Sequence, residues 1–317
     1  MVQGVLFALG ACFIWGLIFV VPQFMGDVTS LEITLSRYLF YGLISTLIFC
    51  KDRLKKKCHY PLFIWVKAFH FSLISTIFYY TCLVLALRYA TPAIAALILG
   101  VSPILIAFYG NAKHKEVTYR SLLIPSLLIL IGLVMINIPH FKQANSPSSY
   151  TLGLLCSLAS LLAWSWFVVA NSRFLKNHVQ VRSGDWSTLM GVAALFWALL
   201  FSLILFLFFD DQLNLEKLFT PGRDLVHFLL GGAILGLLCS WVGSFLWNKA
   251  SLHLPVALAG QLTIFETIFG VTFVYLIARE FPPMWESLGI LLLLTAILYG
   301  IKQFARKKSS IPPLSPH

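Results

Sequence analysis

The chain has 317 residues, of which 59% are hydrophobic and only 11% are charged. Soluble domains carry about 25% charged residues, so this composition excludes a soluble globular protein and predicts one that crosses a membrane many times. The net charge of +11 does not predict a nucleic-acid partner, because the Lys and Arg residues stand in short segments between apolar runs, where they orient a membrane protein. The six cysteines form no CxxC pair, so we expect no metal site and no disulfide framework.

Ten apolar runs long enough to cross a bilayer follow one another along the chain. In chain order, as spans 1 to 10, they are predicted at Val2–Val21, Leu31–Cys50, Leu62–Leu87, Pro92–Gly110, Ser121–Ile138, Thr151–Ala170, Trp186–Phe209, Leu225–Trp247, Leu254–Ile277 and Pro283–Ile301. The predicted fold is therefore all-α, a polytopic membrane protein with ten transmembrane helices. Residues 304–317 are predicted to form a disordered cytoplasmic tail.

The basic residues predict the orientation of the chain. With the N-terminus in the cytoplasm, sixteen of the 23 Lys and Arg residues fall in cytoplasmic segments and five in outer segments. An excess of Lys and Arg marks the cytoplasmic loops of membrane proteins. Both termini are therefore predicted to be cytoplasmic.

The two halves of the chain carry similar patterns in the same order. Trp15 and Trp164 stand at matching places in spans 1 and 6, and the segments Ala86–Pro92 and Ala250–Pro255 each end in a proline that opens the next helix. The offset is five spans, an odd number, so the second half is predicted to be inverted relative to the first. The predicted repeats are residues 1–141 and 142–303, with a substrate site near the midplane between them, as in many secondary transporters.

These segments also carry a family resemblance. Ala11–Gly16 in span 1, Ser36–Tyr38 in span 2, Ala86–Pro103 and Ala250–Glu266 resemble the EamA type of the drug/metabolite transporter superfamily, over essentially the whole chain. The resemblance implies two inverted five-helix EamA-like repeats in a bacterial inner membrane and transport of small metabolites, often outward. It also implies a central cavity lined mainly by spans 1, 3, 4, 6, 8 and 9. The family often has a proline after the glutamate of span 9, where this chain has Thr267, so the kink expected there lacks its usual cause.

Glu266 lies near the middle of span 9, far from any polar segment. A charged side chain at that depth costs about 2.5 kcal/mol or more on insertion scales unless it is paired, hydrated or neutralised. Helical spacing places Thr263 and Gly270 on the same face, so Glu266 is expected to face a cavity. Two roles remain open: a coupling or substrate-binding residue that exchanges a proton with water, or a structural residue that hydrogen-bonds across to a neighbouring helix and fixes packing, with the indole N–H of Trp15 or Trp164 as candidate partners.

Other polar and aromatic residues within the spans are candidate substrate contacts. For most of them the alternative is packing between helices, and for Arg37 it is a side chain that reaches to the membrane surface. A planar guanidinium at this position would otherwise suit a substrate carboxylate. The candidates besides Glu266 are Trp15, Arg37, Tyr79, Trp164, Trp247, Asn248 and Gln261.

The sequence as a whole predicts a secondary transporter that moves a small metabolite across the bilayer by alternating access. The predicted substrate is an amino acid or related compound, the predicted direction is export, and protons are the candidate coupling ion. Uptake or exchange of a nucleotide-like or adenosyl-type solute is the alternative among transporters, and a membrane-embedded lipid-modifying enzyme is the alternative outside them. The chain has no HExxH, GxSxG, P-loop or GxGxxG motif, so we expect neither an enzyme nor a cofactor.

Overall fold

The computed structural model describes residues 1–26, 28–56, 60–90, 92–114, 117–141, 150–208 and 225–309. Within these residues every regular element is helical; η1 and η2 are 3₁₀ turns, and η3 and η5 are π-helical. The elements are α1 (Val2–Gly16), η1 (Leu17–Phe19), η2 (Val21–Phe24), α2 (Ser30–Lys56), α3 (Leu62–Ser72), η3 (Leu73–Phe78), α4 (Tyr79–Tyr89), α5 (Pro92–Gly100), α6 (Ser102–His114), α7 (Tyr119–Phe141), α8 (Tyr150–Asn177), α9 (Ser183–Phe208), α11 (Leu225–Ile234), η5 (Leu235–Val242), α12 (Gly243–His253), α13 (Val256–Leu262), α14 (Ile264–Ala278) and α15 (Met284–Ser309).

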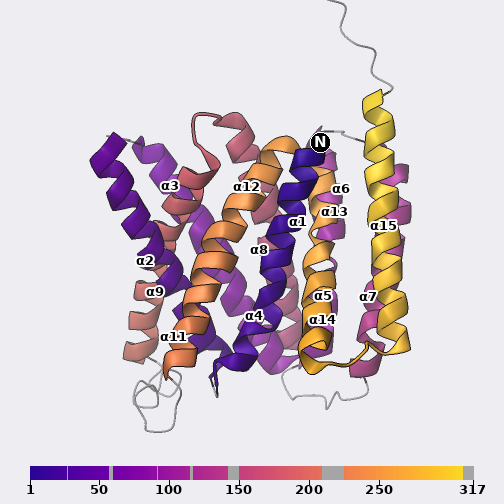
Figure 1. Cartoon of the computed structure of the whole chain (residues 1–317), viewed down its shortest axis with the longest axis horizontal. Coiled ribbons are helices and arrows are strands. Elements are labelled where there is room, and N and C mark those ends of the chain that lie inside the picture. Colours follow the sequence, from indigo (N-terminus) through magenta and orange to yellow (C-terminus); the bar gives the residue numbers. More distant parts are fainter. Residues whose placement is uncertain are drawn as a thin grey trace, which may run out of the picture.

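Ten helical runs of the described residues are long and apolar enough to cross a membrane, which confirms the predicted all-α fold with ten spans. The helices stand side by side in one bundle, and the N-terminus lies at the same end of it as the last turns of α15 (Figure 1). We call this end the terminal face and the other end the opposite face. Because α15 continues to Ser309, residues 304–309 of the predicted tail are helical, and residues 310–317 lie outside the described part of the chain.

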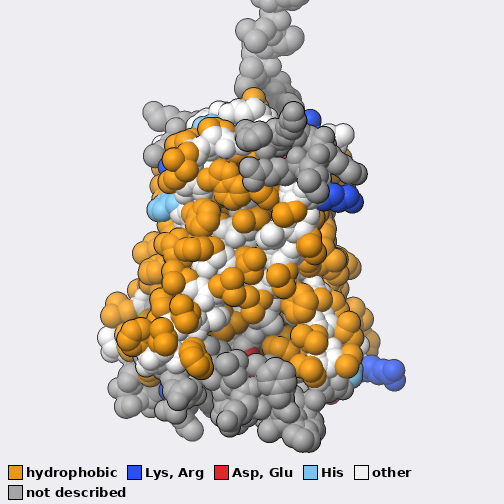
Figure 2. All heavy atoms as spheres, turned by 90° about the vertical axis from the view of Figure 1, so that its left-hand side faces the viewer, with side chains coloured by type: hydrophobic (Ala, Val, Ile, Leu, Met, Phe, Trp, Pro, Cys, Tyr) orange, Lys and Arg blue, Asp and Glu red, His pale blue; other side chains and the backbone are white. Residues whose placement is uncertain are grey.

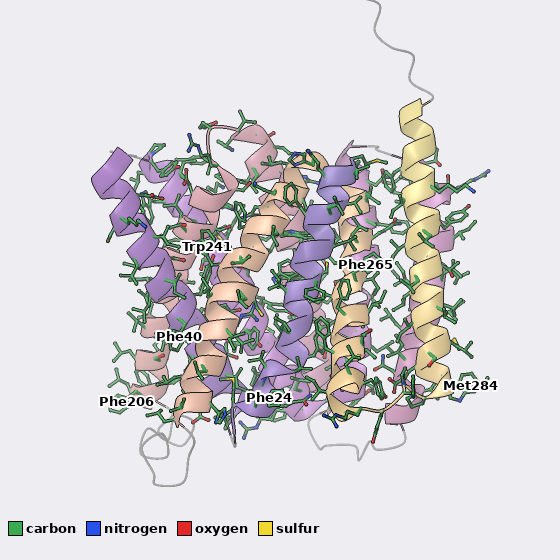
Figure 3. The ribbon with its side chains drawn as sticks, viewed as in Figure 1. Phe24, Phe40, Phe206, Trp241, Phe265 and Met284 are labelled. Atoms are coloured by element: carbon green, nitrogen blue, oxygen red, sulfur yellow. The ribbon has the colours of Figure 1, made fainter. Side chains whose placement is uncertain are left out.

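The outside of the bundle is apolar, as a lipid-facing surface must be. Hydrophobic side chains cover the middle of the face seen in Figure 2, and the Lys and Arg side chains in view lie toward its two ends. Phe206 near the end of α9 and Met284 at the start of α15 are 53% and 76% exposed and lie at the two edges of the bundle (Figure 3). Side chains of this kind, which would be exposed to water in a soluble protein, are solvated by hydrocarbon here.

The closest helix pairs are those that a two-fold axis between the two halves would relate. Helix α2 packs against α9, α6 against α13, and α7 against α15, so spans 2, 4 and 5 each meet their counterparts five spans later. Helix α1 packs against α12 and α4 against α8. The same axis would relate these two pairs, because it would map spans 1 and 8 onto spans 6 and 3. The pattern agrees with two inverted five-helix halves.

The irregular segments repeat in the same way. Span 3 contains the π-helical η3 and span 8 contains the π-helical η5, while spans 4 and 9 are each interrupted, between α5 and α6 and between α13 and α14. The interruption of span 9 falls at Thr263, so the break expected from the resemblance exists without a proline after Glu266. Isolated π-helical segments occur frequently at functional sites, and both of these adjoin the cavity described below.

Two glycines allow the halves to approach closely. A Cβ atom on Gly236 of η5 would lie 2.6 Å from the Cβ of Phe40 and 2.7 Å from the backbone nitrogen of Tyr41, on α2. A Cβ atom on Gly260 of α13 would lie 2.5 Å from Cγ2 of Ile106, on α6. No side chain fits at either place without moving a helix, so these contacts fix η5 on α2 and α13 on α6.

Candidate functional site

A cavity of about 810 Å³ lies between the two halves of the bundle. All six spans expected from the resemblance contribute to its wall. Spans 2, 5 and 7 contribute as well, through residues such as Tyr38, Asn137 and Met190. The volume is in the range of sites that bind small molecules.

The cavity reaches toward the opposite face, and its lining residues nearest the terminal face are buried, with Asn171 1% and Trp186 0% exposed. Because successive spans alternate in direction, Leu87 near the end of α4 and Asn137 near the end of α7 lie toward the opposite face, and both line the cavity. At the other end its wall includes Trp186, close to the start of α9. Between Trp186 and the terminal face, Nζ of Lys176 on α8 donates a hydrogen bond at 2.7 Å to the carbonyl of Leu254, which lies between α12 and α13.

Most of the predicted site residues lie around this one space. The residues that line it are Trp15, Arg37, Tyr79, Trp164, Trp247, Asn248 and Glu266. The eighth, Gln261, is only 1% exposed and lies against Gly300 of α15. Its amide atoms have no hydrogen-bond partner among the described residues. Contact of these side chains with substrate remains a prediction.

Four aromatic rings form a continuous wall of the cavity. The ring of Trp15 lies 5.4 Å from Trp247 and 6.1 Å from Trp164 between ring centres. Trp164 in turn lies 5.2 Å from Tyr79. The two tryptophans at matching places in the two halves therefore meet, edge to face. Such a wall offers π faces both to an aromatic group and to an organic cation.

Arg37 enters the cavity from α2. Its Nε donates a hydrogen bond to Oγ of Ser240 at 2.8 Å, and the guanidinium carbon lies 5.6 Å from the centre of the Tyr38 ring. Tyr38 packs edge to face on Tyr80, at 5.9 Å, and both tyrosines line the cavity. The side chain of Arg37 is therefore directed into the bundle, and the alternative in which it reaches to the membrane surface is wrong.

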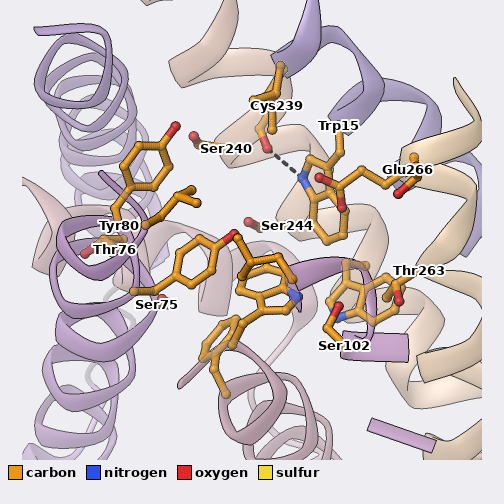
Figure 4. Close-up of a pocket in the computed structure, with 18 of the residues that line it drawn as sticks. Trp15, Ser75, Thr76, Tyr80, Ser102, Cys239, Ser240, Ser244, Thr263 and Glu266 are labelled. Atoms are coloured by element: carbon orange, nitrogen blue, oxygen red, sulfur yellow. Dashed lines mark hydrogen bonds between the residues drawn. The ribbon is translucent and has the colours of Figure 1, made fainter. Parts of the chain in front are cut away.

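Glu266 enters the cavity from the first turn of α14, just after the break at Thr263. Figure 4 shows its side chain and that of Trp15 turned into the same space. The indole N–H of Trp15 donates to the carbonyl of Cys239 at 2.8 Å, and the indole of Trp164 has no hydrogen bond to the described residues. Neither tryptophan holds the carboxylate, so the structural role considered for Glu266 lacks its expected partner.

Arg37 and Glu266 thus present opposite charges to one cavity. Within the described part of the chain neither forms an ion pair, with the other or with any other side chain. Unpaired charges in an environment of low dielectric are costly. A ligand that carries both a carboxylate and an amine would compensate the charges of both Arg37 and Glu266, whereas a ligand with a single charge would compensate only one of them.

Asn248 belongs to a buried network at the closed end of the cavity. Its Oδ1 accepts a hydrogen bond from Nδ2 of Asn171 at 2.8 Å, and its own Nδ2 donates to Oγ of Ser187 at 2.9 Å. Nε1 of Trp186 donates to Oδ1 of Asn171 at 2.7 Å. The network joins α8, α9 and α12 directly beneath the tight packing at the terminal face.

Sequence reasoning missed most of this network because it placed the span ends too early or too late. Span 6 was predicted to end at Ala170, whereas α8 runs to Asn177 and carries Asn171 inside the bundle. Span 7 was predicted to begin at Trp186, whereas α9 begins at Ser183. The signal that could have found Asn171 was its place directly after the predicted end of span 6, where a polar residue can still lie inside the bundle. Among the described residues, no group of three His, Cys, Asp or Glu side chains is placed to hold a metal ion.

Comparison with known proteins gives a consistent result. The model of the EamA-like transporter family matches residues 2–138. The chain is 30% identical over 313 residues to the inner membrane protein YtfF of Escherichia coli (strain K12), an alignment that covers 95% of this chain and 96% of YtfF. One protein of known crystal structure superposes with a TM-score of 0.74 at 18% identity, covering 97% of this chain and 99% of the other, which shows a shared fold.

Proposed function

The chain belongs to the EamA-like transporter family of the drug/metabolite transporter superfamily, and from this premise we propose that it is a secondary transporter of a small zwitterionic metabolite, an amino acid or a related compound. That it is a multi-pass inner membrane protein follows from its ten apolar helices and its inner membrane relative. The observation that carries the proposed substrate class is the presence of Arg37 and Glu266, unpaired and opposite in charge, in the wall of one cavity.

In the proposed complex the two charged ends of the substrate bind to different halves of the protein. The guanidinium of Arg37, on α2, receives the carboxylate, because its planar fork of N–H groups matches the two oxygens. Glu266, on α14, receives the amine, with the faces of Trp15 and Trp164 beside it to contribute cation–π attraction. A substrate that bridges the halves favours the closure needed for alternating access.

We further propose that the moving units are the two predicted repeats, residues 1–141 and 142–303, and that both termini are cytoplasmic. In that orientation the cavity in this structure is directed away from the cytoplasm. Export in exchange for protons is the proposed direction, with Glu266 carrying the proton. The support for this arrangement is the excess of Lys and Arg in segments at the terminal face and the pairing of helices across the two halves.

The other candidate functions fit the cavity less well. A nucleotide would bring phosphate charge into a space that holds the carboxylate of Glu266 as well as the guanidinium of Arg37. A lipid-modifying enzyme would need acid, base or nucleophile groups in mutual contact, and Arg37 and Glu266 form no such contact. The family also points to a transporter rather than to an enzyme.

The substrate class is tested by the thermal stability of the purified protein with matched ligands. We expect phenylalanine to raise the melting temperature more than phenethylamine, which lacks the carboxylate, or hydrocinnamate, which lacks the amine. A ligand at one hundred times its Kd stabilises the folded state by about 2.7 kcal/mol, which this measurement resolves. Adenosine monophosphate is the comparison for the nucleotide alternative. Equal shifts with phenylalanine and phenethylamine, or a larger one with the nucleotide, would contradict the proposal.

The orientation is tested with a short epitope inserted into the full-length protein. An epitope after Glu280, in the connection between α14 and α15, should bind antibody in intact spheroplasts, because this connection lies at the opposite face. An epitope after Gln180, between α8 and α9, should bind only after the membrane is permeabilised. Both connections are accessible, since Val179 is 79% and Phe281 96% exposed. Antibody binding to both epitopes in intact spheroplasts would overturn the proposed topology.

A further inference from the structure

We propose that Ser240 is a positioning residue, which holds Arg37 so that the two Nη groups of its guanidinium face the cavity and receive the substrate carboxylate end-on. The proposal rests on the proposed function, because it concerns how the same site recognises the carboxylate of a zwitterion. It assigns a role to the π-helical segment of span 8, η5, which carries Ser240.

The hydroxyl of Ser240 interacts with Arg37 as a hydrogen-bond acceptor. Its Oγ donates a hydrogen bond to the carbonyl of Leu235, five residues earlier, at 3.1 Å. A serine hydroxyl has a single proton, so Oγ is left as an acceptor, and it accepts from Nε of Arg37 at 2.8 Å. The polarity of this chain of hydrogen bonds is fixed: Arg37 donates to Ser240, and Ser240 donates to Leu235.

Two backbone carbonyls of the π-helical segment η5 accept side-chain hydrogen bonds at the cavity wall. The carbonyl of Leu235 anchors Ser240, and the carbonyl of Cys239, the residue before Ser240, accepts the indole N–H of Trp15 at 2.8 Å (Figure 4). One short segment therefore orients both a charged group and an aromatic ring of the site.

Close contact between η5 and α2 keeps the bond short. A Cβ atom on Gly236 would lie 3.0 Å from the carbonyl oxygen of Arg37 itself. Only glycine at this position lets the backbone of η5 rest on the turn of α2 that carries Arg37. Ser240 follows one helical turn after Gly236, so it faces the same helix.

With Nε occupied, the guanidinium has one free edge. Its two Nη groups have no hydrogen-bond partner among the described residues, while the adjacent Tyr38 ring lies 5.6 Å from the guanidinium carbon. The two parallel N–H bonds of this edge match a carboxylate. An Arg37 free to rotate about its own side chain would present this edge only part of the time.

The test compares binding of phenylalanine and phenethylamine to four full-length proteins: the unmodified chain, Ser240→Ala, Arg37→Lys, and the double variant. We expect Ser240→Ala to weaken binding of phenylalanine about ten-fold, the effect of losing one hydrogen bond to a charged group, and to change binding of phenethylamine less than two-fold. In the Arg37→Lys background, Ser240→Ala should have no further effect, because a lysine side chain has no Nε donor at that distance. The matched control is Ser157→Ala, which removes a buried hydroxyl that bonds only within α8 and should leave binding of both ligands unchanged.

Unchanged phenethylamine binding also reports that Ser240→Ala is folded. If that variant does not fold, Ser240→Cys replaces it, since sulfur is of similar size and accepts hydrogen bonds weakly; the expected loss is the same. Equal weakening for both ligands, or an equal effect of Ser240→Ala with and without Arg37, would overturn the positioning role. A failure of the proposed substrate class is distinguishable, because the unmodified protein would then bind phenylalanine no better than phenethylamine.

Discussion

Asn171→Leu is expected to lower the free energy of unfolding by about 2–6 kcal/mol. The substitution keeps a side chain of similar length but leaves the indole N–H of Trp186 and Oδ1 of Asn248 without partners. Each buried polar group that loses its partner costs about 1–3 kcal/mol. Asn171 is 1% exposed and Trp186 0%, so water does not replace the lost bonds. Thermal unfolding of the purified protein measures the change.

Asn137→Leu is the matched control for this prediction. The amide of Asn137 also lies inside the bundle, but it donates to the carbonyl of Leu133 in its own helix, so its removal leaves no orphaned group on another helix. A decrease within about 1 kcal/mol is expected for the control. If the two variants lose the same stability, the network does not hold α8, α9 and α12 together in the way the structure indicates.

The location of the hydrogen-bond network around Asn171 and Asn248 also bears on the proposed transport cycle. The network lies between the cavity and the tight packing of the terminal face, where a transporter that opens in the other direction has to separate its helices. In the proposed alternating-access cycle, its hydrogen bonds would stabilise the conformation seen here relative to one open at the terminal face. The same bonds would then contribute both to folding and to the balance between the two conformations.

The fold was predictable from the sequence because the membrane imposes simple rules on it. A hydrocarbon layer requires runs of apolar residues long enough to cross it and backbones that satisfy their own hydrogen bonds. Ten such runs could be counted, and the offset of five spans between Trp15 and Trp164 was enough to predict inversion. Only the span ends were inaccurate, as at Ala170, because polar residues such as Asn171 can lie inside a bundle when other helices provide their partners.

Part of the cavity wall was predictable from the sequence, because the membrane also restricts where polar and charged residues can lie. A polar or charged residue at mid-membrane depth is costly when it faces lipid, and this placed Glu266 on an inner face. Arg37 lies nearer the end of its span, so the sequence left open whether it enters the cavity or reaches to the membrane surface. The partners of these residues could not be read from the sequence. The acceptor for Trp15 is a backbone carbonyl in η5, and the partner of Arg37 is Ser240, 203 residues later in the chain. Hydropathy carries no signal for a π-helical turn, and hence none for the groups that it exposes.

Glu266→Gln is expected to separate transport from its dependence on pH. Burial in a dry site disfavours the charged form of a carboxyl group, so when the cavity closes Glu266 must hold either a proton or the amine of the substrate. In the proposed mechanism the proton and the amine of the substrate compete for this one carboxylate, and this competition would couple their movements. Glutamine keeps the shape and hydrogen bonding of the residue but does not titrate. Substrate affinity should also fall, by about ten-fold or more, because a charge-assisted hydrogen bond is lost.

The control for this variant is Glu280→Gln, which removes the same charge from an exposed position between α14 and α15. It should retain the affinity, the rate and the pH response of the unmodified protein. A change in this control as large as that in Glu266→Gln would mean that the net charge of the chain, rather than the position of Glu266, determines the behaviour.

Efflux from proteoliposomes tests the central claim, that this cavity is a transport site in which Glu266 exchanges substrate for a proton. Vesicles containing the purified protein are loaded with the panel compound that stabilises it most, in labelled form, and efflux is followed with the outside at acid, neutral and alkaline pH. We predict saturable efflux that is faster when the outside is more acidic than the inside, and efflux from Glu266→Gln vesicles that does not respond to the pH difference. Efflux no faster than from protein-free vesicles, or the same pH response in Glu266→Gln, would contradict the claim.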